Sequence, residues 1–258
     1  MPLYFRNVNR AIILFVLVTF FGHNSTGQKS IEDSTISVVA LGAQIGLSYP
    51  LGELGLRFGY SGMTGGSLMF KTKSNWIIEP NMAILFGNQV KEDSILDPIT
   101  TNTNIIIDRT GNPANVVFFE RGFITSVRVG KIWSMIGPNP NCGIQTTLGV
   151  GYMQHRIRIQ DESESIPQLQ GNYRKGYDRF TSGLSLMQGV GYQHFSNYRF
   201  INYYIGLEIH EGFTKNRRAI NFDTMESDNK LRLDVLVNLT LRWYFPMYKR
   251  QPKDFYFY

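Results

Sequence analysis

The chain has 258 residues, of which 43% are hydrophobic, and it carries a formal net charge of +6 and a single cysteine. Abundant aromatic residues and a low net charge per residue exclude a chain that is disordered as a whole, and one cysteine excludes a disulfide scaffold. No run of about 18 apolar residues occurs, which excludes a membrane protein built from helices.

Residues 1–27 have the three parts of a secretory signal peptide. Arg6 and Arg10 supply the positive start, residues 11–22 are apolar, and Ser25 and Gly27 place small residues at the cleavage positions. We therefore expect cleavage before Gln28 and export of the chain. The alternative is an uncleaved anchor helix, which the short apolar run disfavours. Export, and basic residues that form no stripe, give no support for a nucleic-acid partner.

The rest of the chain alternates between apolar residues and small or polar residues, which is the period of a β-strand with different surroundings on its two faces. In the last predicted strand, for example, Leu239 and Leu241 share one face, and Asn238 and Arg242 share the other. In chain order we expect eight strands, at residues 39–49, 63–72, 76–86, 116–133, 144–159, 180–195, 201–213 and 231–245.

The predicted connections alternate between short and long. This pattern is typical of an outer-membrane barrel, with its turns in the periplasm and its loops outside. We therefore predict an all-β fold, an eight-stranded antiparallel up-and-down transmembrane β-barrel over residues 28–247, surrounded by outer-membrane lipid and lipopolysaccharide. The tryptophans fall at the turn ends of their strands, where an inner aromatic belt is expected: Trp76, Trp133 and Trp243.

The apolar face of each strand is predicted to point outward, toward lipid. A soluble barrel or sandwich with that face turned inward is the alternative, but it would expose a second face that is rich in glycine. The interior of an eight-stranded barrel is filled by side chains, so an open pore is disfavoured and a narrow pore stays an alternative. Glu208 and Arg242 are expected to pair in this interior. The other candidate lumen residues are Gln44, Glu79, Asn81, Arg128, His210, Asp234 and Asn238.

Several stretches are similar to known sequences: Arg57–Tyr60, Phe70–Trp76, Gly176–Arg179, Gly212–Arg218, Asn221–Thr224 and Asp254–Tyr258. Through them the chain resembles small outer-membrane β-barrels of Bacteroidota, of the PorT-like type. The resemblance implies a barrel without known chemistry that has a structural, assembly or secretion-accessory role. It transfers no catalytic residue.

One stretch could carry chemistry. His194, Ser196 and Asn197 resemble the His-x-Ser-Asn motif of lipid A deacylases, and Glu208 lies at the spacing of their acid. The alternation, however, places His194 and Glu208 on opposite faces of the wall. We therefore expect no catalytic residue, no metal and no cofactor, and we keep the deacylase-like hydrolase as an alternative.

Two features suggest partners. A group of basic residues near the outer rim suits the phosphates of lipopolysaccharide or an envelope protein, although ordinary loop solubility also explains it. The aromatic and basic tail, residues 248–258, is expected to be periplasmic and either docks an envelope protein or folds back under the barrel. Cys142 is expected in a periplasmic turn, as an unpaired surface thiol or as a link to a partner. The rim residues are Arg156, Arg158, Arg174, Lys175, Arg179, Lys215, Arg217 and Arg218.

Overall fold

The computed structural model describes residues 31–92, 94–103, 105–161, 165–197 and 200–247. These residues all belong to one compact unit of the chain. The predicted signal peptide, residues 1–27, and the predicted tail, residues 248–258, lie outside the described residues.

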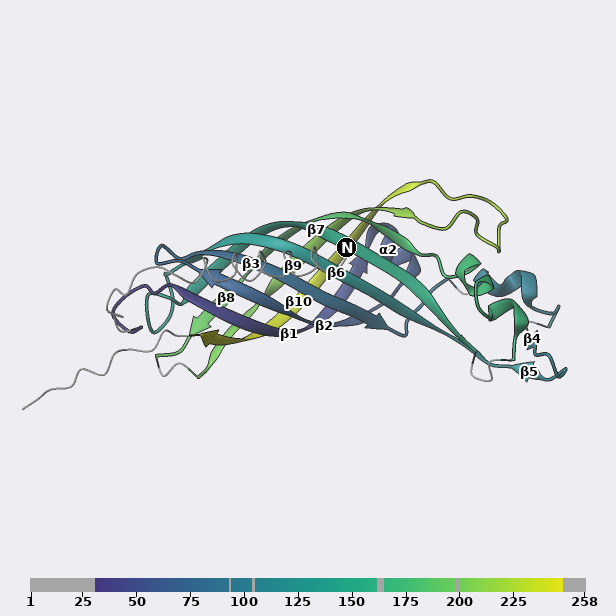
Figure 1. The fold of residues 1–258 in the computed structure, drawn as a ribbon, viewed down its shortest axis with the longest axis horizontal. Helices are drawn as coiled ribbons and strands as arrows, with labels where there is room; N and C mark the ends of the chain where they lie inside the picture. The colour runs from purple at the N-terminus through teal and green to yellow at the C-terminus, as the bar shows by residue number, and fades with distance from the viewer. Residues whose placement is uncertain (1–30, 93, 104, 162–164, 198–199, 248–258) are drawn as a thin grey trace, which may run out of the picture. The chain divides into compact units, whose positions relative to one another are not determined.

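Eight long antiparallel strands form a closed barrel (Figure 1). Each strand pairs with its neighbours along the chain, and the first strand closes the ring by pairing with the last, from Val39–Met247 to Leu51–Val235. Closure leaves no unpaired edge, which removes the usual aggregation hazard of a sheet. The strands are β1 (Val38–Leu51), β2 (Ser61–Lys71), β3 (Trp76–Gly87), β6 (Val116–Trp133), β7 (Gly143–Asp161), β8 (Thr181–Phe195), β9 (Asn202–Asn216) and β10 (Leu231–Met247).

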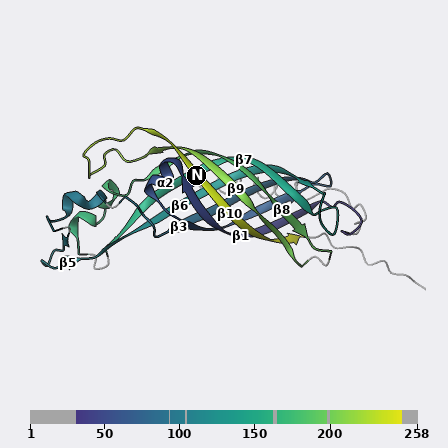
Figure 2. The same ribbon diagram turned by 180° about the vertical axis from the view of Figure 1, so that it is seen from behind.

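The predicted eight-stranded antiparallel fold is confirmed, and each strand lies where the alternation of apolar and polar residues indicated. The apolar face of the wall points outward: Ile45 is 60% exposed and Leu207 is 51% exposed. The polar face points inward, where Gln44, Glu208 and Asn238 are buried. The alternative of a soluble barrel with its apolar face inside is therefore wrong. Figure 2 shows the same ring of strands from behind.

The interior has three layers, and the sequence predicted the middle one. Charged and amide side chains fill the middle, and an apolar cluster lies at each end. At the turn end, Met69, Ile77 and Phe195 pack inside the barrel together with Cys142, which is 1% exposed. The expected surface position of Cys142 is therefore wrong. The interior also holds more apolar side chains than predicted, since the sequence predicted small and hydrophilic side chains there.

The long connections hold short elements where the sequence predicts only loops. They are α2 (Gly52–Arg57), the 3-10 helices Ser94–Ile99, Pro167–Leu169 and Tyr173–Gly176, and a small hairpin of β4 (Ile106–Ile107) and β5 (Pro113–Ala114). Buried residues of these connections, such as Leu54, Phe58 and Ile95, pack with strand residues in the loop-end apolar cluster. No helix in the described part of the chain is long and apolar enough to cross a membrane.

Candidate functional site

A network of buried charges fills the middle of the barrel. Glu208 Oε1 accepts hydrogen bonds from Arg242 Nη2 at 2.8 Å and from Arg128 Nη1 at 2.7 Å. Arg242 also lies 3.5 Å from Glu79, which accepts a hydrogen bond from Tyr244 at 2.9 Å. The structure thus contains the Glu208–Arg242 contact and extends it to two arginines and two glutamates whose formal charges cancel. Balanced pairing is what burial of charge requires.

This network spans the interior, because its members come from strands that are not neighbours in the sheet. Arg128 lies on β6 and Glu208 on β9, with two strands between them in the ring. Gln44 of β1 joins through a 3.0 Å hydrogen bond from Arg242 Nε. Side chains that meet across the lumen support a structural interior rather than a pore.

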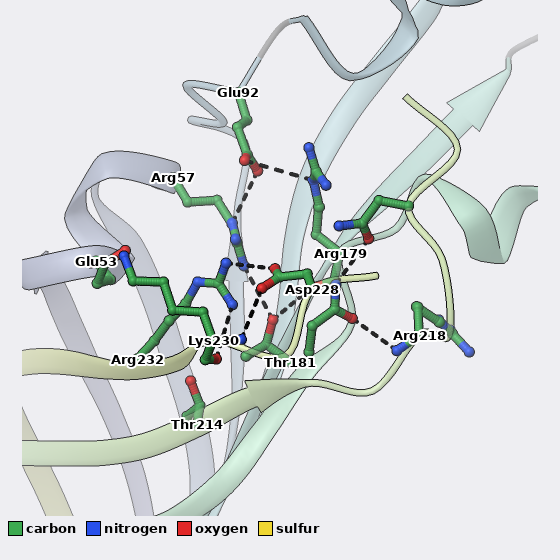
Figure 3. A network of polar contacts seen from close by, with 12 residues as sticks. Glu53, Arg57, Glu92, Arg179, Thr181, Thr214, Arg218, Asp228, Lys230 and Arg232 are labelled. Carbon is green, nitrogen blue, oxygen red and sulfur yellow. Dashed lines mark hydrogen bonds and ion pairs between the residues drawn. The ribbon is translucent and has the colours of Figure 1, made fainter. Parts of the chain in front are cut away.

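A second set of contacts ties the four long connections to one another (Figure 3). Arg57 in α2 pairs with Glu92 at 3.0 Å, and Arg179 pairs with Asp223 at 2.5 Å and lies 3.7 Å from Glu92. Arg218 pairs with Asp178. Each of these contacts joins different connections, so together they hold the loop end in one arrangement.

Asp228, another acid at the loop end, has a lowered pKa because of its hydrogen-bond partners. Asp228 pairs with Arg232 at 2.5 Å. Partial burial alone would raise the pKa of Asp228, but the hydrogen bonds from Arg232 and the Lys230 backbone outweigh it and hold the pKa below its ordinary value.

Several of the predicted rim residues therefore serve the loops themselves. Arg179 and Arg218 form the ion pairs described above, Arg174 donates to the Leu169 carbonyl at 2.7 Å, and Arg217 donates to Ser182 at 2.8 Å. The rim residues that the structure leaves exposed are Arg156, Arg158, Lys175, Lys215 and Arg217.

A cavity of about 370 Å³ opens beside this rim, and three arginines line it: Arg121, Arg156 and Arg218. Arg121 of β6 and Arg156 of β7 are directly opposite one another in the strand register. The Arg121 guanidinium lies over the Phe119 ring at 5.0 Å, and that of Arg218 lies over Phe180 at 5.1 Å. The remaining lining residues are Gly122, Phe123, Gln154, His155 and Phe180.

The charges of this arginine pocket are not balanced within the described chain. Like charges directly opposite one another destabilise an antiparallel pair, and no described carboxylate lies within ion-pair distance of Arg121 or Arg156. Arg218 alone has an acidic partner, Asp178. A bound anion would relieve the repulsion, and two guanidinium groups match the geometry of a phosphate.

Arg156 and Arg218 are among the residues predicted from the sequence, and Arg121 is not. The sequence does carry one indication that Arg121 faces outward, because it lies two residues before Phe123 and therefore on the same, outward face of β6. Alternation in the first part of this strand is weak, because Phe118 and Phe119 are adjacent and on opposite faces.

The structure does not bring the hydrolase-like residues together. His194 lies on the outer side of β8, where its ring stacks on Tyr203 at 5.0 Å. Glu208 is buried inside the barrel against Arg128 and Arg242, and Ser196 lies in the turn after β8. The wall of the barrel separates the candidate base from its candidate acid.

The tryptophans at the turn end are all partly exposed. Trp76 is 49% exposed, Trp133 is 43% exposed and Trp243 is 40% exposed. Lys131 lies between the first two, with its Nζ 5.6 Å from the Trp76 ring centroid and 4.7 Å from that of Trp133.

No family model and no curated protein matches the chain. Among solved structures, it is similar to Neisserial surface protein A, with 9% identity and a TM-score of 0.43 over 80% of this chain and 96% of that one. It is also similar to Ail, the attachment invasion locus protein of Yersinia pestis, with 7% identity and a TM-score of 0.41 over 81% and 99%. A third similarity is to the outer membrane protein OprG from Pseudomonas aeruginosa, with 13% identity and a TM-score of 0.37 over 83% and 99%. These values are low, and the fold is defined by the chain's own strand pairing.

Proposed function

We propose that the chain is a non-enzymatic outer-membrane β-barrel protein whose arginine pocket binds the phosphates of lipopolysaccharide. Three features support the membrane location. The outward face is apolar along the strands, the tryptophans lie at one end of it, and arginines lie at the other. Removing apolar surface from water contributes a favourable free energy of roughly 25 cal/mol per Å². The outward side chains gain this free energy if lipid covers them and lose it if they face water.

The single observation that carries the phosphate proposal is the register of Arg121 opposite Arg156. Two cations directly opposite one another cost an antiparallel pair stability, and an anion between them would offset that cost. Arg121 Nη1 donates to the Glu120 carbonyl at 2.6 Å, so its remaining guanidinium donors are the ones open to an anion. The pocket also lies at the loop end, where the outward-facing Phe123 lines it and the Tyr152 ring centroid is 6.2 Å from that of Phe123. Aromatic side chains of this kind occupy the boundary between lipid and water, and lipid A phosphates lie at that boundary.

Binding of lipid A to the detergent-purified barrel tests this proposal. A charge-assisted hydrogen bond contributes about 1.5–3 kcal/mol, so the Arg121→Gln/Arg156→Gln double variant should bind bisphosphorylated lipid A at least about tenfold more weakly. Lys91→Gln, at an exposed loop lysine outside both the pocket and the predicted rim group, is the matched control and should bind like the wild type. Equal affinity of the double variant, or equal affinity of the wild type for dephosphorylated lipid A, would refute the proposal.

The proposal assigns no chemistry to His194 and Ser196. Ser196→Ala should therefore leave the acylation of lipid A unchanged when cellular lipid A is analysed by mass spectrometry. Loss of a deacylated lipid A species in the variant would instead favour the hydrolase hypothesis.

A structural or secretion-accessory role is the second part of the proposal. Its support is the set of ion pairs that fixes the four long connections, since a fixed surface loses little entropy when a partner binds. Cross-linking of the tagged protein in cells, followed by mass spectrometry, tests this role. Repeated recovery of one envelope protein that is lost in Arg179→Ala would support it, and recovery unaffected by that variant would not.

A further inference from the structure

A second hollow lies on the outer wall of the barrel, near the turn end and away from the arginine pocket. Its volume is about 710 Å³, within the range of small-molecule sites. Side chains of five consecutive strands, β3 and β6 to β9, line it, and most of them are apolar. They are Val129 of β6, Leu148 of β7, Val190 of β8, and Leu207 and Ile209 of β9, together with Trp76 and Trp133.

The hollow has a physical cause in the strand register. Lys131, Thr146, Val190 and Leu207 are opposite one another across β6 to β9. The short side chain of Thr146 lies between longer neighbours, and its hydroxyl accepts a hydrogen bond from Trp133 Nε1 at 3.0 Å. This bond holds the indole at the end of the hollow.

One end of this groove carries a cation. Lys131 is the one outward-facing lysine or arginine in the turn-side half of the described strands, and two indole rings hold its ammonium group. No described carboxylate lies within ion-pair distance of it. The group is therefore available to an anion from the surroundings.

The opposite charge lies just beyond the other end of the groove. Gln188 lines the groove and donates a hydrogen bond of 3.0 Å to Glu211, which also faces outward. An anionic headgroup would be repelled at this end and attracted at the Lys131 end. The groove is therefore apolar along its length and favours one orientation of an amphipathic anion, with the anionic group at the Lys131 end.

We propose that this groove binds one glycerophospholipid, with its phosphate against Lys131 and an acyl chain along Val190 and Leu207. The proposal rests on the membrane location proposed above. With the turns in the periplasm, the Lys131 end lies in the leaflet that holds phospholipid, whereas lipopolysaccharide occupies the leaflet of the arginine pocket. Charge complementarity and the amphipathic lining select this ligand.

Native mass spectrometry of the detergent-purified full chain, titrated with phosphatidylglycerol, tests the proposal. The wild type should retain one lipid, and Lys131→Gln should bind it about tenfold more weakly, as expected for loss of one charge-assisted contact. Lys73→Gln is the matched control, because Lys73 is an exposed lysine in the turn between β2 and β3, outside the groove. It should bind like the wild type.

A second pair of variants tests the acyl-chain contact. Val190→Trp should fill the groove and abolish retention of the single lipid. Val127→Trp, at an outward position outside the groove, should not. Equal retention by wild type and Lys131→Gln, or equal loss in Lys131→Gln and Lys73→Gln, would overturn the proposal. A barrel that stays soluble without detergent would instead refute the membrane location, so the two failures are distinguishable.

Discussion

Removal of the Glu208 carboxylate should be among the most damaging single changes in the barrel. In the Glu208→Gln variant, Arg128 and Arg242 lose their shared anion, and Glu79 balances one of the two cations. One buried arginine is then left without a counter-charge. Breaking a buried pair in this way costs about 3–5 kcal/mol, so we expect a loss of that size in the free energy of unfolding.

The loss can be measured by guanidinium unfolding in lipid vesicles, with tryptophan fluorescence as the signal. The double variant Glu208→Gln/Arg128→Met removes the surplus cation and should recover at least half of the loss, because a balanced network is restored. Lys230→Gln is the control, since it breaks an ion pair with Glu53 in which the lysine side chain is 63% exposed. Its cost should be below about 1 kcal/mol.

Two results would refute this reasoning. One is a loss below about 1 kcal/mol in Glu208→Gln, which would mean that water or another group solvates the two arginines. The other is a double variant as unstable as the single one, which would show that lost packing and not unpaired charge is responsible.

Three further predictions concern other parts of the barrel. Burial raises the pKa of the Cys142 thiol, so a maleimide should not label it in the folded protein and should label it after unfolding; labelling at equal rates would contradict its interior position. The folded-state pKa of Asp228 lies below its ordinary value of 3.8. The stabilisation that the Asp228 carboxylate gives the folded barrel should therefore be complete above pH 3.8 and should be lost as the pH falls through the folded-state pKa. Asp228→Asn should flatten this part of a titration of unfolding free energy from pH 5 to pH 2, and an unchanged profile would exclude the Arg232 contact as the cause of the pH dependence. A Cβ at Gly183 would clash with the Phe213 carbonyl oxygen, so Gly183→Ala should destabilise the barrel by about 1–3 kcal/mol. Unfolding of the variant at the same guanidinium concentration as the wild type would show that the strands shift to accept the methyl group.

The strands and their outward faces could be predicted because each has a period of two that survives along its length. This pattern assigns Leu239 and Asn238 to opposite faces of β10, and in the structure Leu239 lies outside the barrel and Asn238 inside it. The Arg128–Glu208 contact could not be predicted in this way. It joins strands that are not neighbours, and the register that brings them together depends on the closure of the whole ring.

The features that sequence reasoning missed share a different cause. Cys142 lies in a connection of ordinary turn composition, and it is buried because that turn folds onto the end of the barrel, where the Phe195 amide donates to its sulfur at 3.2 Å. α2 is a helix of six residues, too short to show a helical period. Arg121 shares an outward face with Phe123, but its assignment to a site depends on the register that places it opposite Arg156.

The most direct measurement of the central claim is the environment of the two faces of β10. Nitroxide labels at Leu239 and Thr240, each in a Cys142→Ser background and in lipid vesicles, report access to oxygen and to a water-soluble nickel complex. A barrel with its apolar face in lipid predicts high oxygen access and low nickel access at Leu239, and low access to both reagents at the buried Thr240. High nickel access at Leu239 would place that face in water and contradict the account.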